Sequence, residues 1–209
     1  MQFKTRERES QMLRSFVKYL SDYKMGFLDA INTTAALHPA YSSVLQFISR
    51  EVRLGGTMHD AMMQKKRAFN LPTLYLTCVG EEIGGIDKTL LKASELVRYG
   101  DNPRKIEEIL FYYSLGFMIG KTGLPILRSV RCLEDMPVRL NVFPYRKSLQ
   151  KIGESLEGGH TLSGAMERSG KYFPKEVVLR LEVAEKHSML GEELLRISKD
   201  IQQDYFLAR

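Results

Sequence analysis

Apolar residues recur along the chain every three or four positions, which is the pattern of an amphipathic helix. Phe16, Val17, Leu20 and Tyr23 follow this spacing, and Gly26 interrupts it. Alternation of apolar and polar residues, the pattern of a half-buried strand, is nearly absent. The sequence therefore predicts an all-α fold.

Turn-forming residues set the ends of the predicted helices. A helix that starts at Phe27 must stop before His38-Pro39, because proline disfavours helical geometry in the preceding residue. Thr57, with Asp60 three residues later, is a capping-box-like start for a short helix. The segments predicted in the first half lie around 16–23, 27–37, 44–52, 58–66, from 72 onward and around 86–97. Those predicted in the second half are 109–119, 125–133, 146–156, 162–168, 175–186 and 190–206.

The chain also repeats itself. A shift of 104 positions brings identical residues together, among them Tyr41 with Tyr145, Gln46 with Gln150, Gly55 with Gly159, Thr57 with Thr161, and Glu81 with Glu185. Upstream the shift falls to 97, so seven extra residues of the second copy belong between Val130 and Pro144. The turn-rich segment 100–103 is the natural linker. We predict two tandem antiparallel six-helix bundles, residues 1–101 and 102–209.

Composition excludes several classes of protein but points to no catalytic or binding residue. Of 209 residues, 44% are hydrophobic and 27% are charged, which excludes a disordered chain. Two cysteines, Cys78 and Cys132, are too few for a disulfide framework and favour a reducing compartment. The net charge of +6 is spread over both halves, +4 in residues 1–104 and +2 in residues 105–209, so it does not form the stripe that nucleic-acid binding requires.

The sequence supports neither a secreted or membrane-spanning protein nor a metal-binding or catalytic one. The first residues lack the apolar stretch of a signal peptide, and the most apolar run, 109–120, is too short to span a bilayer. His38, His59, His160 and His187 show no metal-ligand spacing, and each is predicted to be a turn or surface residue. No phosphate loop or nucleophile elbow is present, so we predict no enzyme activity, no metal and no cofactor.

Several short segments resemble one family in their order and spacing. Gly123-Leu124-Pro125 follows one predicted helix and precedes the next. Glycine turns, a Phe173-Pro174 pair and the segment 80–86, Gly-Glu-Glu-Ile-Gly-Gly-Ile, continue the pattern. In this the chain is similar to the type II secretion system F domain, found in inner-membrane platform proteins of type II secretion and type IV pilus machines. Members usually carry membrane-spanning helices between two copies, whereas a short polar linker joins the copies here.

The resemblance implies a function. It implies a non-enzymatic scaffold, cytoplasmic and peripheral at the inner face of the inner membrane, that binds the assembly ATPase and neighbouring platform subunits. It also implies possible homodimers, and nucleic acid is not an expected partner. The alternatives are a basic helical module that binds nucleic acid or an anionic membrane surface, and a hydrolase that lacks any recognisable catalytic group.

Three carboxylates are the first candidate site. Glu81 and Glu82 lie near the end of a predicted helix, where the helix dipole disfavours negative charge, so they require a partner. In the structural interpretation, Glu81 accepts hydrogen bonds from the first turn of the next helix. In the functional one, Glu81, and Glu185 at the matching position, contact a cation or another protein.

A methionine-rich segment with adjacent basic residues is the second candidate. Met58, Met62 and Met63 precede Lys65-Lys66-Arg67, and together they are either core plus solvated charge or a docking surface. Structural turns, rather than binding, are assigned to a third group: Gly26, Gly55, Gly84, Gly123, Pro125 and Gly159.

Overall fold

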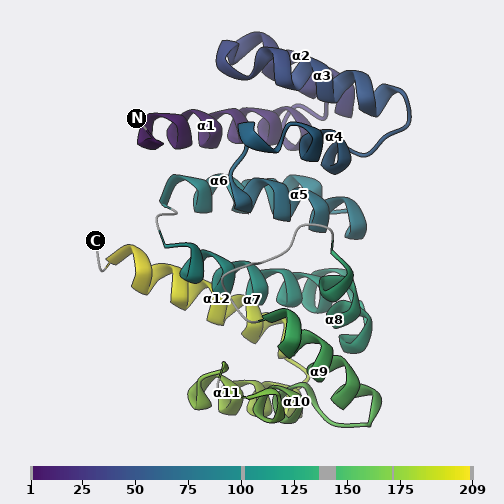
Figure 1. The fold of residues 1–209 in the computed structure, drawn as a ribbon, viewed down its shortest axis with the longest axis vertical. Coiled ribbons are helices and arrows are strands. Elements are labelled where there is room, and N and C mark those ends of the chain that lie inside the picture. Colours follow the sequence, from purple (N-terminus) through teal and green to yellow (C-terminus); the bar gives the residue numbers. More distant parts are fainter. Residues whose placement is uncertain (1, 100–101, 137–144, 171, 208–209) are drawn as a thin grey trace. The chain divides into compact units, whose positions relative to one another are not determined.

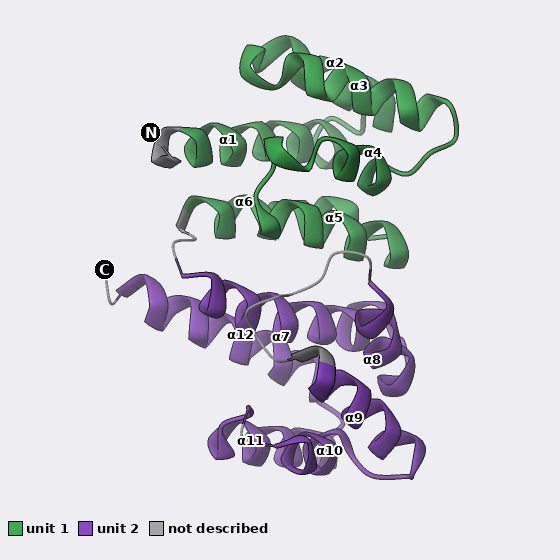
Figure 2. Cartoon of the chain, in the orientation of Figure 1, with its two compact units in different colours: residues 1–101 green, residues 102–209 purple. Residues whose placement is uncertain are grey.

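The protein is all-α, as predicted. The computed structural model describes residues 2–99, 102–136, 145–170 and 172–207, and within them it contains α-helices and two short 3-10 helices but no strand (Figure 1). The chain divides into two compact units, residues 1–101 and 102–209 (Figure 2). Across the described ranges, no helix has both the length and the hydropathy that crossing a bilayer demands.

Within its described residues, unit 1 holds six α-helices. The first begins at Gln2, well before the predicted 16–23, whereas the fourth and fifth start at turn signals of the sequence. Thr57 caps the fourth by accepting a hydrogen bond from the Asp60 amide, and Pro72 lies in the first turn of the fifth. The helices are α1 (Gln2–Ser21), α2 (Phe27–Leu37), α3 (Ser42–Arg53), α4 (Met58–Gln64), α5 (Leu71–Ile83) and α6 (Ile86–Tyr99), with η1 (Pro39–Tyr41) and η2 (Lys66–Ala68) between them.

Unit 2 holds six more helices in the part of it that the structure describes. Its first helix is longer than the predicted 109–119, because Asn102 caps it and Pro103 occupies its first turn. The helices are α7 (Pro103–Thr122), α8 (Ile126–Asp135), α9 (Tyr145–Glu157), α10 (Leu162–Ser169), α11 (Lys175–Lys186) and α12 (Leu190–Leu207). Most of the predicted insertion, and Gly100 and Asp101 of the predicted linker, fall outside the described residues.

The same succession of helix pairs builds the core of each unit. In unit 1, α1 packs on α6, α2 on α3, α3 on α4, α4 on α5, and α5 along α6. In unit 2, α7 packs on α12, α8 on α9, α9 on α10 and α10 on α11, whereas α11 touches α12 over a shorter stretch. Large apolar side chains such as Phe16, Met62, Phe111 and Leu194 are completely buried at these contacts.

A buried carboxylate from α1 organises the start of α5. Glu9 is fully buried, and its Oε1 accepts hydrogen bonds from the Asn70 amide at 2.9 Å and the Thr73 hydroxyl at 2.6 Å. Its Oε2 accepts from Asn70 Nδ2 at 2.6 Å. Burial raises the pKa of Glu9 above its ordinary value, although these hydrogen bonds oppose the rise. Glu9 thus satisfies donors that α5 leaves open at its N-terminus.

Candidate functional site

Glu81 binds the first turn of α4. The carboxylate comes from the last turns of α5, and its two oxygens accept from the backbone amides of Met58 at 2.6 Å and His59 at 2.8 Å. The Thr57 hydroxyl accepts from the Asp60 amide at 3.0 Å. Three of the four amides that a helix leaves unpaired at its start therefore have side-chain acceptors.

Glu185 makes the matching contact in unit 2. Its Oε1 accepts from the amides of Leu162 at 2.6 Å and Ser163 at 3.2 Å, at the start of α10. The Ser163 hydroxyl donates to Oε2, and Thr161 accepts from the Gly164 amide at 3.2 Å. Each unit therefore places a carboxylate of its fifth helix on the N-terminus of its fourth.

The structural interpretation of Glu81 named the wrong helix. Its carboxylate reaches the start of α4, and backbone bonds close the turn that leads to α6: the Gly85 amide donates to the Gly80 carbonyl at 2.9 Å, with Gly84 at φ +74°. The position is favourable, because an anion at a helix N-terminus interacts well with the dipole. Glu82 is exposed. Within the described residues, no group of three or more His, Cys, Asp or Glu is arranged to hold a metal ion.

The methionine-rich segment divides into core and surface. Met58 and Met62 are buried, so their assignment to a docking surface was wrong, and Met63 is half-buried. They face inward because α4 packs on α3 and α5, and a thioether fills such space well. His59, predicted as a turn or surface residue, is also buried; it lies in the first turn of α4, and its amide donates to Glu81.

The basic residues after α4 do lie on the surface. Lys65, Lys66 and Arg67 are exposed, and the Lys65 ammonium lies 4.5 Å from the centroid of the Phe47 ring. The guanidinium of Arg50 lies 5.1 Å from the same ring. The Phe47 ring thus makes cation–π contacts with one basic residue of α3 and with one that directly follows α4. We call Arg50, Lys65, Lys66 and Arg67 the basic cluster.

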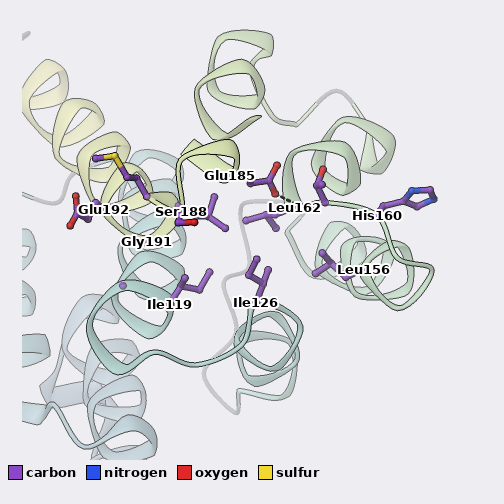
Figure 3. Close-up of a pocket in the computed structure, with 13 residues that line it drawn as sticks. Ile119, Ile126, Leu156, His160, Leu162, Glu185, Ser188, Gly191 and Glu192 are labelled. Carbon is purple, nitrogen blue, oxygen red and sulfur yellow. Dashed lines mark hydrogen bonds between the residues drawn. The ribbon is translucent and has the colours of Figure 1, made fainter. Parts of the chain in front are cut away.

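A cleft adjoins the Glu185 contact. It has a volume of about 560 Å³ and an apolar floor that includes Ile119, Ile126 and Leu162 (Figure 3). Glu185 points toward Leu162, and the ring of His160 points away from both. The Nη1 atom of Arg168 lies 2.9 Å from Nε2 of that ring, at hydrogen-bond distance. The cleft carries two carboxylates, those of Glu185 and Glu192, and no basic residue other than His160 among the described residues that line it.

Three glycines lie where α7 and α12 approach each other, and two of them, Gly120 and Gly191, line this cleft. Sequence reasoning missed all three. A Cβ on Gly191 would lie 2.3 Å from the Cα of Gly120, and one on Gly116 would lie 2.9 Å from the Gly191 carbonyl oxygen. The helices α7 and α12 therefore approach backbone to backbone. The Gly116-x-x-x-Gly120 spacing was the available signal, since it puts both glycines on one helix face.

Comparison with known families identifies unit 2. Residues 111–209 match the family described as Type II secretion system (T2SS), protein F. This stretch of the chain is similar to the type II secretion system F domain. The match runs from α7 to the end of the chain and contains Glu185, the cleft and the Gly123–Pro125 turn.

The F-domain match bears on the general role of the chain. The description of the family places its members in the type II secretion system, so the match points to a component of secretion machinery. No curated protein is significantly similar to the chain. Residues 1–110 lie outside the matched range.

Proposed function

We propose that the chain is a two-bundle platform protein of a type II secretion or type IV pilus-like machine, with an F-type bundle at 1–101 as well as at 102–209. The single observation that carries this proposal is the matched pair of contacts, Glu81 on Met58 and Glu185 on Leu162. Both contacts span 23 residues and both join the fifth helix of a unit to the fourth.

Local geometry supports the repeat at other positions. Gly55 and Gly159 both have positive φ, +93° and +82°, at the turn before the fourth helix. Thr57 and Thr161 then cap that helix with the same hydroxyl contact. The two copies thus agree in backbone conformation at these positions as well as in sequence. Short identities that arose by chance would not be expected to agree in this way.

The basic cluster is the surface we propose for the assembly ATPase. Its residues are exposed and come from two neighbouring segments, and two of them, Arg50 and Lys65, contact the Phe47 ring. A concentrated positive patch attracts an acidic partner surface and accelerates association. Through such contacts the protein would act as a non-enzymatic scaffold at the cytoplasmic face of the inner membrane, between the ATPase and neighbouring platform subunits.

Charge reversal tests the docking proposal. The triple variant Lys65→Glu, Lys66→Glu, Arg67→Glu is compared with Lys147→Glu, Lys151→Glu, Lys175→Glu, which makes the same charge change at exposed positions of unit 2. We expect the first variant to lose co-elution with the cognate hexameric ATPase while its melting temperature is unchanged, and the second to bind as the wild type does.

Two results would overturn the docking proposal: no binding by the wild type at tens of micromolar ATPase, or equal binding by the two variants. Light scattering in the same chromatography also measures self-association. A mass twice the 24.0 kDa of the chain would show the homodimer that the resemblance implies.

A further inference from the structure

Helix α11 leaves an apolar stripe uncovered. Leu179 is 55% exposed and Val183 is 57% exposed, one helical turn apart, and Met189 just beyond the helix is 43% exposed. Together with Ala184 they line a groove of about 430 Å³ between α11 and the first turns of α12. Exposed large apolar side chains gathered in one groove are typical of an interaction site.

Ion pairs across the groove neutralise most of its charges. The guanidinium of Arg180 contacts Glu193 at 2.6 Å and Asp200 at 2.8 Å, and Arg196 contacts Glu193 at 2.8 Å. Glu176, at the start of α11, is different. Within the part of the chain that the structure describes, its carboxylate has no hydrogen-bond or ion-pair partner. The groove therefore offers apolar side chains and one available negative charge at its end.

The corresponding face of unit 1 is closed. Tyr75 and Val79, which align with Leu179 and Val183, are buried, and α5 packs along α6. Gly80 permits this, because a Cβ there would lie 2.2 Å from Thr89 Oγ1 and 2.7 Å from the Cα of Ile86. The aligned residue in unit 2 is Ala184. Ala184 carries a methyl group where Gly80 has none, and α12 leaves the stripe of α11 exposed.

We infer that the α11 groove binds an amphipathic helix of a partner protein. In unit 1 a helix, α6, packs along the matching element, so the face is shaped for a helix. From Glu176 to His187 the groove is about 16 Å long at 1.5 Å per residue, which corresponds to about three helical turns. The partner helix carries apolar residues at i, i+3 or i+4, and i+7, with a lysine or arginine opposite Glu176.

This inference rests on the proposed repeat, which supplies the comparison between Gly80 and Ala184, but not on ATPase docking. The probe is a fluorescent helical peptide of about 12 residues with leucines at that spacing and a lysine at one end. A second peptide has glutamate in place of the lysine, and a third has the same composition in scrambled order. Anisotropy measures binding of each to the full chain.

We expect Val183→Asp to weaken binding of the lysine peptide at least about tenfold, because one apolar contact is lost and a charge is desolvated. Glu176→Lys should weaken the lysine peptide and strengthen the glutamate peptide. Leu54→Asp is the matched control, since Leu54 is 77% exposed in unit 1, and it should bind as the wild type does.

Equal binding of the scrambled peptide, or unchanged binding by Val183→Asp, would overturn the inference. So would a dimer of the wild type that Val183→Asp dissociates, because a second copy would then be the occupant. Loss of ATPase binding in the basic-cluster variant reports on the proposed function alone, since those residues lie in unit 1 and the groove lies in unit 2.

Discussion

The carboxylate of Glu81 accepts a hydrogen bond from the backbone amide of Met58 at 2.6 Å, although 23 residues separate them. Such a contact combines a cap for one helix with a tie between two helices. It uses the partial positive charge at the start of α4 and fixes where α5 crosses it. Glu185 and Leu162 repeat the arrangement at 2.6 Å.

Removing either charge should lower stability. We expect Glu81→Gln and Glu185→Gln each to reduce the free energy of unfolding by about 1–3 kcal/mol, because an amide has only one acceptor oxygen for two buried donors. Urea denaturation measures the change. Glu82→Gln, at an exposed neighbour, should stay within about 0.5 kcal/mol of the wild type. A Glu81→Gln variant of unchanged stability that loses a binding partner would instead show that the carboxylate serves recognition.

The crossing of α7 and α12 should tolerate no side chain at Gly191. A Cβ there would lie 2.3 Å from the Cα and 2.4 Å from the amide nitrogen of Gly120, and backbone cannot rotate away as a side chain can. We expect Gly191→Ala to cost about 1–3 kcal/mol or more by overpacking. Thermal unfolding monitored by circular dichroism tests this. Gly164→Ala is the control, because the nearest atom to its Cβ, Thr161 Oγ1, is 3.3 Å away. Equal melting temperatures for the two variants would refute the close crossing.

Glu9 should make unit 1 less stable as the pH rises. Burial raises its folded pKa above the ordinary value of 4.5, so the folded state holds the proton more tightly than the unfolded state does. Stability from this group is then complete below pH 4.5 and falls as the pH rises through the folded pKa. Glu9→Gln removes this titration. The unfolding free energy of the wild type minus that of the variant should therefore decrease from about pH 4 to about pH 7. An increase over this range would contradict the direction of the pKa shift.

Local signals account for what the sequence predicted well. Helix α11 has the bounds predicted from its periodicity, and α2 stops before His38-Pro39 as the proline requires. Thr57 caps α4 as its spacing from Asp60 indicates. The family resemblance is confirmed over residues 111–209, because the order of turns and helix starts is a property of the chain itself.

Tertiary contacts account for what the sequence did not predict. Periodicity cannot show that Glu81 reaches α4, because the two segments meet only after α5 folds back on it. From the sequence alone, Gly80 and Gly191 would be expected only to destabilise their helices. In the structure, Gly80 allows α5 to approach α6, and Gly191 allows α12 to approach α7. The burial of His59 follows from the same cause, since Glu81 holds its amide against α5.

A methyl group at Gly80 should force α5 away from α6. Its Cβ would lie 2.7 Å from the Cα of Ile86, which is backbone, so α6 itself must move. We expect Gly80→Ala to cost about 1–3 kcal/mol and to expose Tyr75 and Val79, as Leu179 and Val183 are exposed beside Ala184. Amide hydrogen exchange measures the opening: protection should fall in α5 and α6, while α2 and α3 keep theirs. The reverse change, Ala184→Gly, should allow α12 to approach α11 and should weaken binding of the leucine–lysine peptide. If Gly80→Ala leaves exchange in α5 unchanged, the difference between the two units has another origin than this one side chain.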